Sequence, residues 1–299
     1  MDDYRPYSMI KVPSKGLYYQ NKKDVFFVKF LSYEEEYILT DLNLMESGHG
    51  IKKVLENVII DDFDVGQLMP GDVQAISLFL RSYGFGDKIT LDVTCPKCKT
   101  VQEKEIRLSD LKMVQVEQLP NKGNFFELTL PHSKKIIKIR MPNFEEEMEA
   151  EKSGAKGFAK KLSQITYELE GEKDKRIIAN AVSQMPMKDS RFLKDFLKKN
   201  TPGVDTSVEH TCDSCSFIFR QEFSAGYNFL TLPASYRDNM LEQLFSISHY
   251  SQGGITWSEA VKMPTVERMW VLRRLQQAHD ERKKEEDKAL KKAKGRARR

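Results

Sequence analysis

The sequence has few cysteines and lacks the motifs of the common enzyme families. It contains four cysteines, five histidines and two tryptophans among 299 residues. It has no P-loop, dinucleotide-binding glycine loop, G-x-S-x-G nucleophile elbow or H-E-x-x-H motif. The histidines are scattered and form no catalytic or ligand spacing: His49, His132, His210, His249 and His279. We therefore expect a protein that is not an enzyme and that takes no small-molecule substrate.

Long apolar runs are also missing. No uninterrupted apolar stretch approaches the roughly 20 residues that span a bilayer. The chain begins Met1-Asp2-Asp3-Tyr4, without the apolar segment of a signal peptide. We expect no membrane partner, and no passage into an oxidising compartment where disulfides would form.

The body of the chain lacks an excess of positive charge. The whole sequence carries a net charge of +4, but residues 280–299 alone contribute +5, which leaves −1 for residues 1–279. A protein that binds nucleic acid over a broad surface needs a basic face. The body does not suit that class. The tail is interpreted either as a solvated or frayed helix or as a grip on a partner or an anionic surface.

All four cysteines fall in two Cys-x-x-Cys pairs, and each pair lies between two strand-like runs. The flanking runs are 88–94 and 101–107 for the first pair, and 206–210 and 217–223 for the second. A pair at a hairpin tip directs two thiolates to one point, and two such tips make a tetrahedral sulfur site that suits Zn²⁺. The sequence therefore predicts one structural zinc ion with four ligands: Cys95, Cys98, Cys212 and Cys215.

Other interpretations of the cysteines remain open. Two local disulfides would require an oxidising compartment. A thioredoxin-like pair normally opens a helix after a strand, whereas each pair here lies between strands. The cysteines could also serve packing alone. His210 lies two residues before Cys212 and is a conceivable replacement ligand, although four cysteines already complete a site.

A repeated order of motifs divides the chain into two similar parts. The acidic triplet 34–36 is echoed at 145–147, Met69-Pro70 at Met185-Pro186, and the first cysteine pair by the second. The cysteine pairs are 117 residues apart and the triplets 111. We infer an internal duplication. The expected fold class is α+β, with two duplicated units joined by a shared zinc-ribbon-like Cys₄ site near a pseudo-two-fold axis.

This duplication gives four expected regions. Residues 1–110 form the first unit and 111–232 the second, each with its hairpin; 233–279 form a helical C-terminal region, and 280–299 a charged basic tail. Hydrophobic spacing and breakers predict a strand at 25–31 and helices at 33–44, 70–83, 156–170, 236–249, 256–262 and from Pro264 onward.

Large apolar side chains in the C-terminal region are candidates for partner binding. Aromatic and methionine side chains tend to anchor protein interfaces. The candidates are Trp257, Met263, Met269 and Trp270. The alternative is that these four side chains pack on the body of the protein.

Four stretches carry a resemblance to the baseplate hub assembly family of T-even-like contractile-tailed bacteriophages. They are 12–18, 82–84 leading into 94–98, 202–205 leading into 209–215, and 257–275. The resemblance implies a non-enzymatic chaperone-like assembly factor or a structural subunit that binds other tail or baseplate proteins. It also implies a location in the cytoplasm of the infected bacterium during assembly, or in the baseplate of the virion.

One departure concerns the turns, because zinc knuckles often place glycine after the second cysteine. Lys99 and Ser216 stand there in this chain.

The alternative to the tail protein is a zinc-ribbon nucleic-acid-binding protein that uses the basic C-terminal tail. A disulfide oxidoreductase is a third class.

Overall fold

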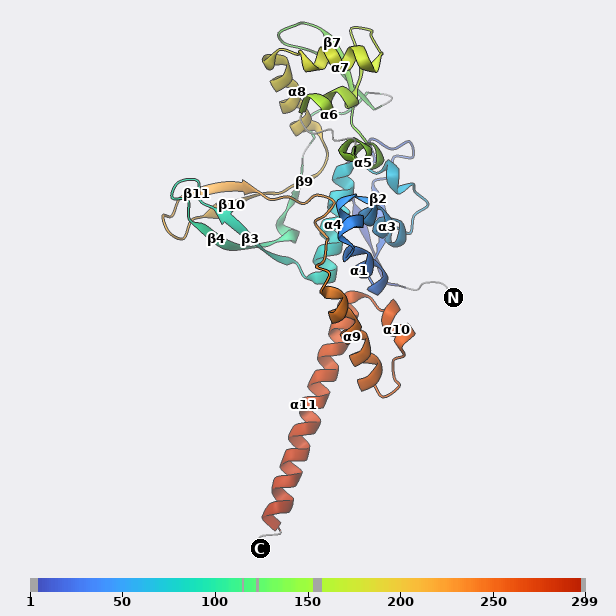
Figure 1. Cartoon of the computed structure of the whole chain (residues 1–299), viewed down its shortest axis with the longest axis vertical. Helices are drawn as coiled ribbons and strands as arrows, with labels where there is room; N and C mark the ends of the chain where they lie inside the picture. The colour runs from blue at the N-terminus through green and yellow to red at the C-terminus, as the bar shows by residue number, and fades with distance from the viewer. Residues whose placement is uncertain (1–4, 115, 122–123, 153–157, 297–299) are drawn as a thin grey trace.

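The computed structural model describes residues 5–114, 116–121, 124–152 and 158–296. The molecule is elongated (Figure 1). The segment from residue 125 to residue 200 forms a body at one end, residues 5–85 lie in the middle, and the C-terminal helices lie at the other end. Two β-hairpins project sideways from the middle. This mixed architecture of helices and strands confirms the predicted α+β class.

The first unit consists of a strand pair, a group of helices and a second strand pair. Its elements are β1 (Tyr7–Lys11), β2 (Val25–Lys29), α1 (Tyr33–Leu39), α2 (Leu42–Glu46), α3 (His49–Val58), the 3₁₀ turn η1 (Val65–Gln67), α4 (Pro70–Phe85), β3 (Lys88–Thr94) and β4 (Val101–Arg107). Ser32 and Glu35 form a capping box that starts α1. Pro70 occupies the first position of α4, where its missing N–H costs nothing.

The second unit repeats this order after a short connection. The connection contains η2 (Leu108–Asp110) and β5 (Lys112–Met113). The unit's elements are β6 (Phe125–Thr129), β7 (Ile136–Arg140), α5 (Phe144–Lys152), α6 (Phe158–Ile165), β8 (Thr166–Leu169), α7 (Lys175–Ser183), α8 (Met187–Asn200), β9 (Val204–Asp205), β10 (Ser207–Thr211) and β11 (Ile218–Glu222). The helices that follow are α9 (Tyr236–Tyr250), α10 (Trp257–Lys262) and α11 (Thr265–Arg296).

Strand pairing supports the duplication beyond the order of elements. β1 pairs with β2, and β6 pairs with β7, both antiparallel. A third segment then adds to the second strand of each pair. In the first unit Ile59 bridges Val28, and in the second Thr166 pairs with Ile139. The two units therefore share a three-segment arrangement that the sequence motifs did not reveal.

A buried aspartate occupies the same place in each unit. Asp72 is the third residue of α4 and Asp189 the third residue of α8. Asp72 Oδ1 accepts the Ser14 N–H at 2.9 Å. Asp189 Oδ1 accepts the His132 N–H at 2.7 Å. Each carboxylate thus fastens the loop between the first two strands of its unit to a later helix.

The hydrophobic core contains residues of both units in one cluster. Phe26 and Leu55 come from the first unit, and Phe126 and Phe144 from the second. The Phe144 N–H also donates to Leu68 O at 2.7 Å, which places α5 against the first unit. The shared cluster positions the second body on the first; the boundaries at 110 and 232 stay a prediction.

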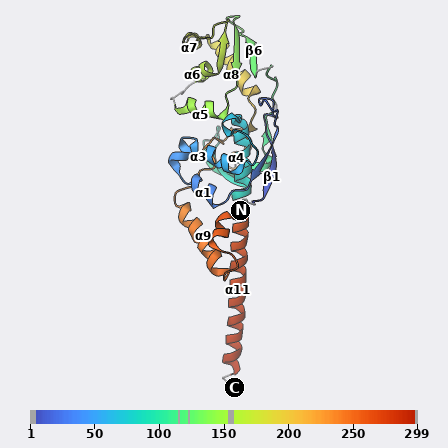
Figure 2. The ribbon, with the colours of Figure 1, turned by 90° about the vertical axis from the view of Figure 1, so that its right-hand side faces the viewer.

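The predicted pseudo-two-fold axis does not extend through the bodies. α5 lies against η1 and α4 of the first unit. The corresponding helix α1 lies instead against α10, and Leu31 beside it accepts the Thr265 N–H at 2.8 Å. The two units therefore use equivalent helices for different neighbours, which lines the bodies up in a row (Figures 1 and 2).

Three predicted helices have different ends in the structure. The predicted helix 156–170 ends at Ile165, and residues 166–169 form β8 because β7 offers an edge to pair with. Its start falls partly on residues 153–157, outside the described residues. The predicted helix 33–44 is two helices, since Asp41 caps α2 by accepting the Leu44 N–H. α4 continues through Gly84 and ends at Gly86, whose φ is +96°.

A buried ion pair attaches the C-terminal helices to the first unit. Glu36 of α1 and Arg268 of α11 are both fully buried and form a salt bridge. Thr265 Oγ1 lies 3.0 Å from Glu36 Oε1, and Arg268 Nε donates to Gln243 Oε1 at 3.0 Å. Burial raises the pKa of the Glu36 carboxyl, and the Arg268 charge opposes this rise. These contacts fix where α11 leaves the body.

α11 extends far beyond its neighbours. It contains 32 residues and runs through the charged stretch that begins at Asp280. Asp280 precedes Lys284 by four positions and Glu285 precedes Lys288 by three, spacings that stabilise an exposed helix. Within the described ranges, none of the helices is both long and apolar enough to cross a membrane.

Candidate metal centre

The two cysteine hairpins have the same turn geometry. In the first, the Cys95 N–H donates to Thr100 O at 3.0 Å and the Lys99 N–H to Cys95 O at 2.9 Å. In the second, the Cys212 N–H donates to Phe217 O at 3.0 Å and the Ser216 N–H to Cys212 O at 2.9 Å. The antiparallel strand pairs β3–β4 and β10–β11 hold each turn at a hairpin tip.

Both turns are tight although neither has a glycine after its second cysteine. Lys99 has a φ of +61° and Ser216 a φ of +56°. Both lie in the left-handed region that favours glycine, where another residue costs roughly 1–2 kcal/mol. The hydrogen bonds of each turn hold these residues in that conformation, so the tight turn forms without the usual residue.

The hairpin tips meet and bring the four cysteine sulfurs together. The four Sγ atoms lie within 4.8 Å of one another. Cys98 and Cys212 are 3.5 Å apart, and Cys95 and Cys215 are 3.8 Å apart. Four sulfurs bound tetrahedrally at a Zn–S distance of about 2.3 Å would be separated by about 3.8 Å. The cluster therefore fits a structural metal ion.

The cysteine pairs differ in exposure but follow a symmetric plan. The first cysteine of each pair, Cys95 and Cys212, is buried; Cys98 is exposed and Cys215 half-buried. All four are free thiols. Val93 and Phe219 pack against the buried pair from below. Such a site has an apolar floor and sulfur ligands on all four sides, which leaves no open position for a substrate.

Two of the neighbouring thiols, Cys98 and Cys215, differ in pKa. The Thr100 hydroxyl and backbone lower the pKa of Cys98 to about 6. The Phe217 N–H lowers the pKa of Cys215, but desolvation and the neighbouring thiols outweigh it and raise the pKa to about 12. Thiolates that lie this close repel one another, so the cluster does not readily hold several negative charges. A bound divalent cation relieves this repulsion because it favours the thiolate forms.

Polar contacts join the two hairpins around the sulfurs. Lys104 Nζ lies 2.5 Å from Asp213 Oδ1, and the Asp213 N–H donates to Gln102 Oε1 at 2.9 Å. On the other side the Thr94 N–H donates to Gln221 Oε1 at 3.2 Å. Gln102, Lys104 and Gln221 were not singled out from the sequence. The sequence does not show which residue a polar side chain on a strand will contact. These three contacts are therefore evident only once the two hairpins are assembled.

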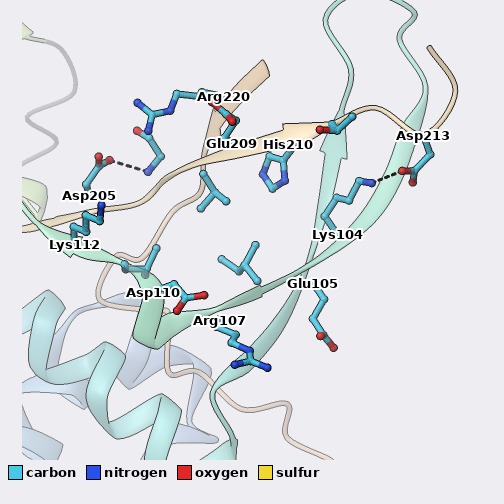
Figure 3. Close-up of a pocket in the computed structure, with 15 residues that line it drawn as sticks. Lys104, Glu105, Arg107, Asp110, Lys112, Asp205, Glu209, His210, Asp213 and Arg220 are labelled. Atoms are coloured by element: carbon cyan, nitrogen blue, oxygen red, sulfur yellow. Dashed lines mark hydrogen bonds and ion pairs between the residues drawn. The ribbon is translucent and has the colours of Figure 1, made fainter. Parts of the chain in front are cut away.

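A cleft of about 610 Å³ lies beside the cluster, between β4 and β10 (Figure 3). Four basic and five acidic side chains line it, so its charge is balanced. Three of its charged groups are engaged within the cleft, since Lys104 pairs with Asp213 and Asp205 accepts the Ser207 N–H. A groove for an anionic polymer would need a basic excess, which this cleft lacks.

His210 lines the same cleft but is not part of the sulfur group. Its side chain is buried beside Phe219, with the ring centroids 5.8 Å apart. Burial lowers the pKa of His210, and Lys104 lowers it further. Nε2 has no hydrogen-bond partner among the described residues. The metal-binding group comprises the four cysteines without the histidine.

The four predicted partner-binding side chains lie on other elements. Trp257 begins α10 and Met263 follows its last residue, whereas Met269 and Trp270 lie on α11. Trp257, Met269 and Trp270 are substantially exposed, and Met263 is half-buried. The C-terminal helices carry them on the other side of the first unit from the second body (Figure 1).

One comparison with known proteins gives a match. A family model described as T4 bacteriophage base plate protein matches residues 7–223. The match includes both units and all four cysteines, and it ends before α9. No curated protein and no solved structure matches the chain.

Proposed function

Because the chain belongs to the T4 bacteriophage base plate protein family, we propose that it is a zinc-stapled scaffold of the phage tail. It acts without catalysis, either as a subunit of the baseplate hub or as an assembly factor for it. The family supports a structural role in the tail and contacts with other tail proteins. The roles of the zinc ion and of the hub are the finer parts of the proposal.

The observation that carries the proposal is the four-sulfur cluster between hairpins 117 residues apart. A metal ion bound there joins the end of the first unit to the end of the second. Because the unfolded chain has no such preformed site, the binding free energy contributes to folding. A closed sulfur site holds the two hairpins rigid and leaves other surfaces free to bind partners.

Trp257, Met263, Met269 and Trp270 are the proposed contacts with other baseplate proteins. Exposed aromatic and methionine side chains commonly anchor interfaces. Assembly takes place in the cytoplasm of the infected bacterium, and a hub subunit would stay in the virion. Replacing Trp270 by Ala should weaken capture of baseplate proteins from infected cells; Tyr167→Ala, an exposed aromatic on the second unit, is the control.

Metal analysis tests the zinc site directly. Purified protein should contain about one zinc ion per chain, as one Cys₄ site requires. The ion should protect all four thiols from alkylation, and a chelator should expose them and lower the melting temperature. Protein that folds fully without metal, or that exchanges its thiols with a disulfide reagent while zinc is bound, would contradict the proposal. The second of these results would favour an oxidoreductase.

The nucleic-acid-binding alternative rests on the end of the chain. Residues 288–299 contain seven basic residues and no acidic one. Full-length protein and a 1–279 truncation should be compared for DNA and RNA binding at several salt concentrations. Tight binding that falls steeply with salt and disappears in the truncation would favour this alternative. We expect weak binding by both forms, because the cleft beside the cluster has balanced charge.

A further inference from the structure

The end of α9 leaves an open groove along α11. α9 packs on α11 through Leu244 and Ile247, which meet Val271, Leu272 and Leu275. α9 ends at Tyr250, and Gly253 and Gly254 then turn the chain away. α11 continues in the same direction without that neighbour (Figures 1 and 2). A groove of about 840 Å³ lies at this point.

The groove has an apolar floor. Leu272, Leu275 and Ala278 line it at intervals of three residues. α9 covers Leu272 and Leu275 in part, and Ala278 continues the stripe beyond them. Tyr250 closes one end and is more than half exposed. An apolar stripe along a helix, bounded by a second helix, is the surface on which amphipathic helices dock.

The groove is lined by two arginines and by no acidic residue. Arg273 and Arg282 line it together with His249 and His279, and Asp280 Oδ1 lies 3.7 Å from His279 Nδ1. Neither arginine has an ion-pair partner within the part of the chain that the structure describes. Elsewhere α11 mixes acidic and basic residues. A ligand that fills this groove would therefore gain from carboxylates on its edges.

We propose that this α9/α11 groove binds an amphipathic helix of another baseplate protein, with apolar residues on one face and Asp or Glu beside them. The proposal rests on the proposed function, since the partner belongs to the tail. A third helix would bury the apolar stripe and pack along α11, which otherwise projects alone. Isolated helices are marginal in water, so such packing would stabilise α11.

The groove is distinct from the surface of the four predicted partner residues. At 100° per residue, Trp270 lies 200° from Leu272 and about 140° from Leu275 around α11. Trp270 therefore faces away from these two leucines, although Arg273, one turn further on, is only about 60° from it. Arg282 lies about three turns beyond Trp270 and about 120° around the helix from it, so a variant at Arg282 tests the groove without changing that other surface.

The experiment uses full-length protein co-expressed with the phage's other baseplate proteins. A photo-crosslinking amino acid replaces Gln276, which lines the groove, or Gln277, which lies outside it. Crosslinked peptides are identified by mass spectrometry. We expect crosslinks from position 276 to a net acidic segment with apolar residues at helical spacing, and at least about tenfold fewer from position 277.

Charge reversal supplies the matched control. Arg282→Glu should reduce the crosslink from position 276 by at least about tenfold. Lys283→Glu changes the net charge of the same helix equally, but Lys283 does not line the groove. Both residues are exposed, so both variants should melt like the parent.

The outcomes separate the two proposals. Capture of no baseplate protein by the parent would overturn the proposed function. Normal capture with equal crosslinking in both charge variants would overturn the groove proposal alone. Crosslinks to a second copy of this chain, to nucleic acid or to a basic segment would also overturn it, because each is a different occupant.

Discussion

At the scale of single residues, Lys99 and Ser216 have the backbone conformation that shapes the two cysteine turns. Each occupies the left-handed conformation directly after a Cys-x-x-Cys pair. The turn hydrogen bonds are the same in both hairpins, although the residues differ in size and polarity. The backbone conformation, rather than the side chain, is therefore what the site requires at these positions.

Lys99→Gly should stabilise the protein relative to a glycine placed elsewhere in the turn. Glycine removes the left-handed penalty of roughly 1–2 kcal/mol but adds about 0.5–1 kcal/mol of chain entropy. Lys97→Gly should only destabilise the protein by this entropic cost, because Lys97 is not in the left-handed region and has no penalty to remove. The entropic cost is common to both variants, so Lys99→Gly should be more stable than Lys97→Gly by about 1–2 kcal/mol, measured by thermal unfolding of the metal-loaded proteins. Equal stabilities would contradict the argument.

The sequence predicted the residues of the cluster but not those around it. A cysteine pair between strands carries its chemistry in its spacing, so the meeting of Cys95, Cys98, Cys212 and Cys215 was foreseeable. Asp72 and Asp189 gave no such signal, since an acidic residue early in a helix usually faces solvent. Their roles depend on loops more than fifty residues away.

At the scale of elements, the clamp between helix and loop should matter equally to both units. Asp72→Ala leaves the Ser14 N–H and hydroxyl buried without their acceptor. We expect a loss of about 1–3 kcal/mol in the free energy of unfolding, measured in urea. Asp189→Ala should give a similar loss, whereas Asp195→Ala, an exposed position on α8, should give little. A much smaller effect of both clamp variants would show that other contacts hold the loops.

The anchoring of α11 depends on its buried charge pair. Arg268→Met leaves the Glu36 carboxylate buried without its partner. We expect a loss of about 3–5 kcal/mol and faster proteolysis of α9 to α11. Adding Glu36→Gln should recover part of the loss, because it removes the stranded charge. Arg274→Met, an exposed arginine on the same helix, should behave like the parent.

Helix ends show where the sequence pattern was insufficient. The apolar spacing from Phe158 to Leu169 is consistent with a single helix, yet β7 recruits its second part as a strand. Tertiary pairing decides such short segments, because helix and strand propensities differ by little. The sequence predicts a solvated or frayed helix beyond Ala278, and the structure continues α11 through this stretch as an exposed helix.

At the scale of the whole molecule, the duplication was visible but the arrangement of the copies was not. Repeated motifs fixed the order of elements, and the strand pairing agrees with it. The motifs do not say which faces of α1 and α5 meet other elements. Those contacts differ between the units, so the pseudo-two-fold relation expected at the metal site does not extend through the two bodies. Spatial arrangement depends on side chains that the two copies do not share.

The shared-site hypothesis predicts equal effects from the two units. Cys95→Ser and Cys212→Ser each remove one ligand of the same ion. Their melting temperatures should fall together and agree within about 3 °C, which corresponds to roughly 1 kcal/mol for a chain of this size. Ser214→Ala, between the ligands of the second pair, should retain the metal. Loss of stability from only one cysteine variant would show that the pairs are independent.

The buried charge pair near the start of α11 has a consequence for the far end of the molecule. The helix of 32 residues is about 48 Å long, and few contacts hold it beyond its first turns. A rotation of 5° at Arg268 would therefore move the tip by about 4 Å, roughly the width of a side chain. The position of the far end of α11 is thus set by the fit of Glu36, Gln243, Thr265 and Arg268.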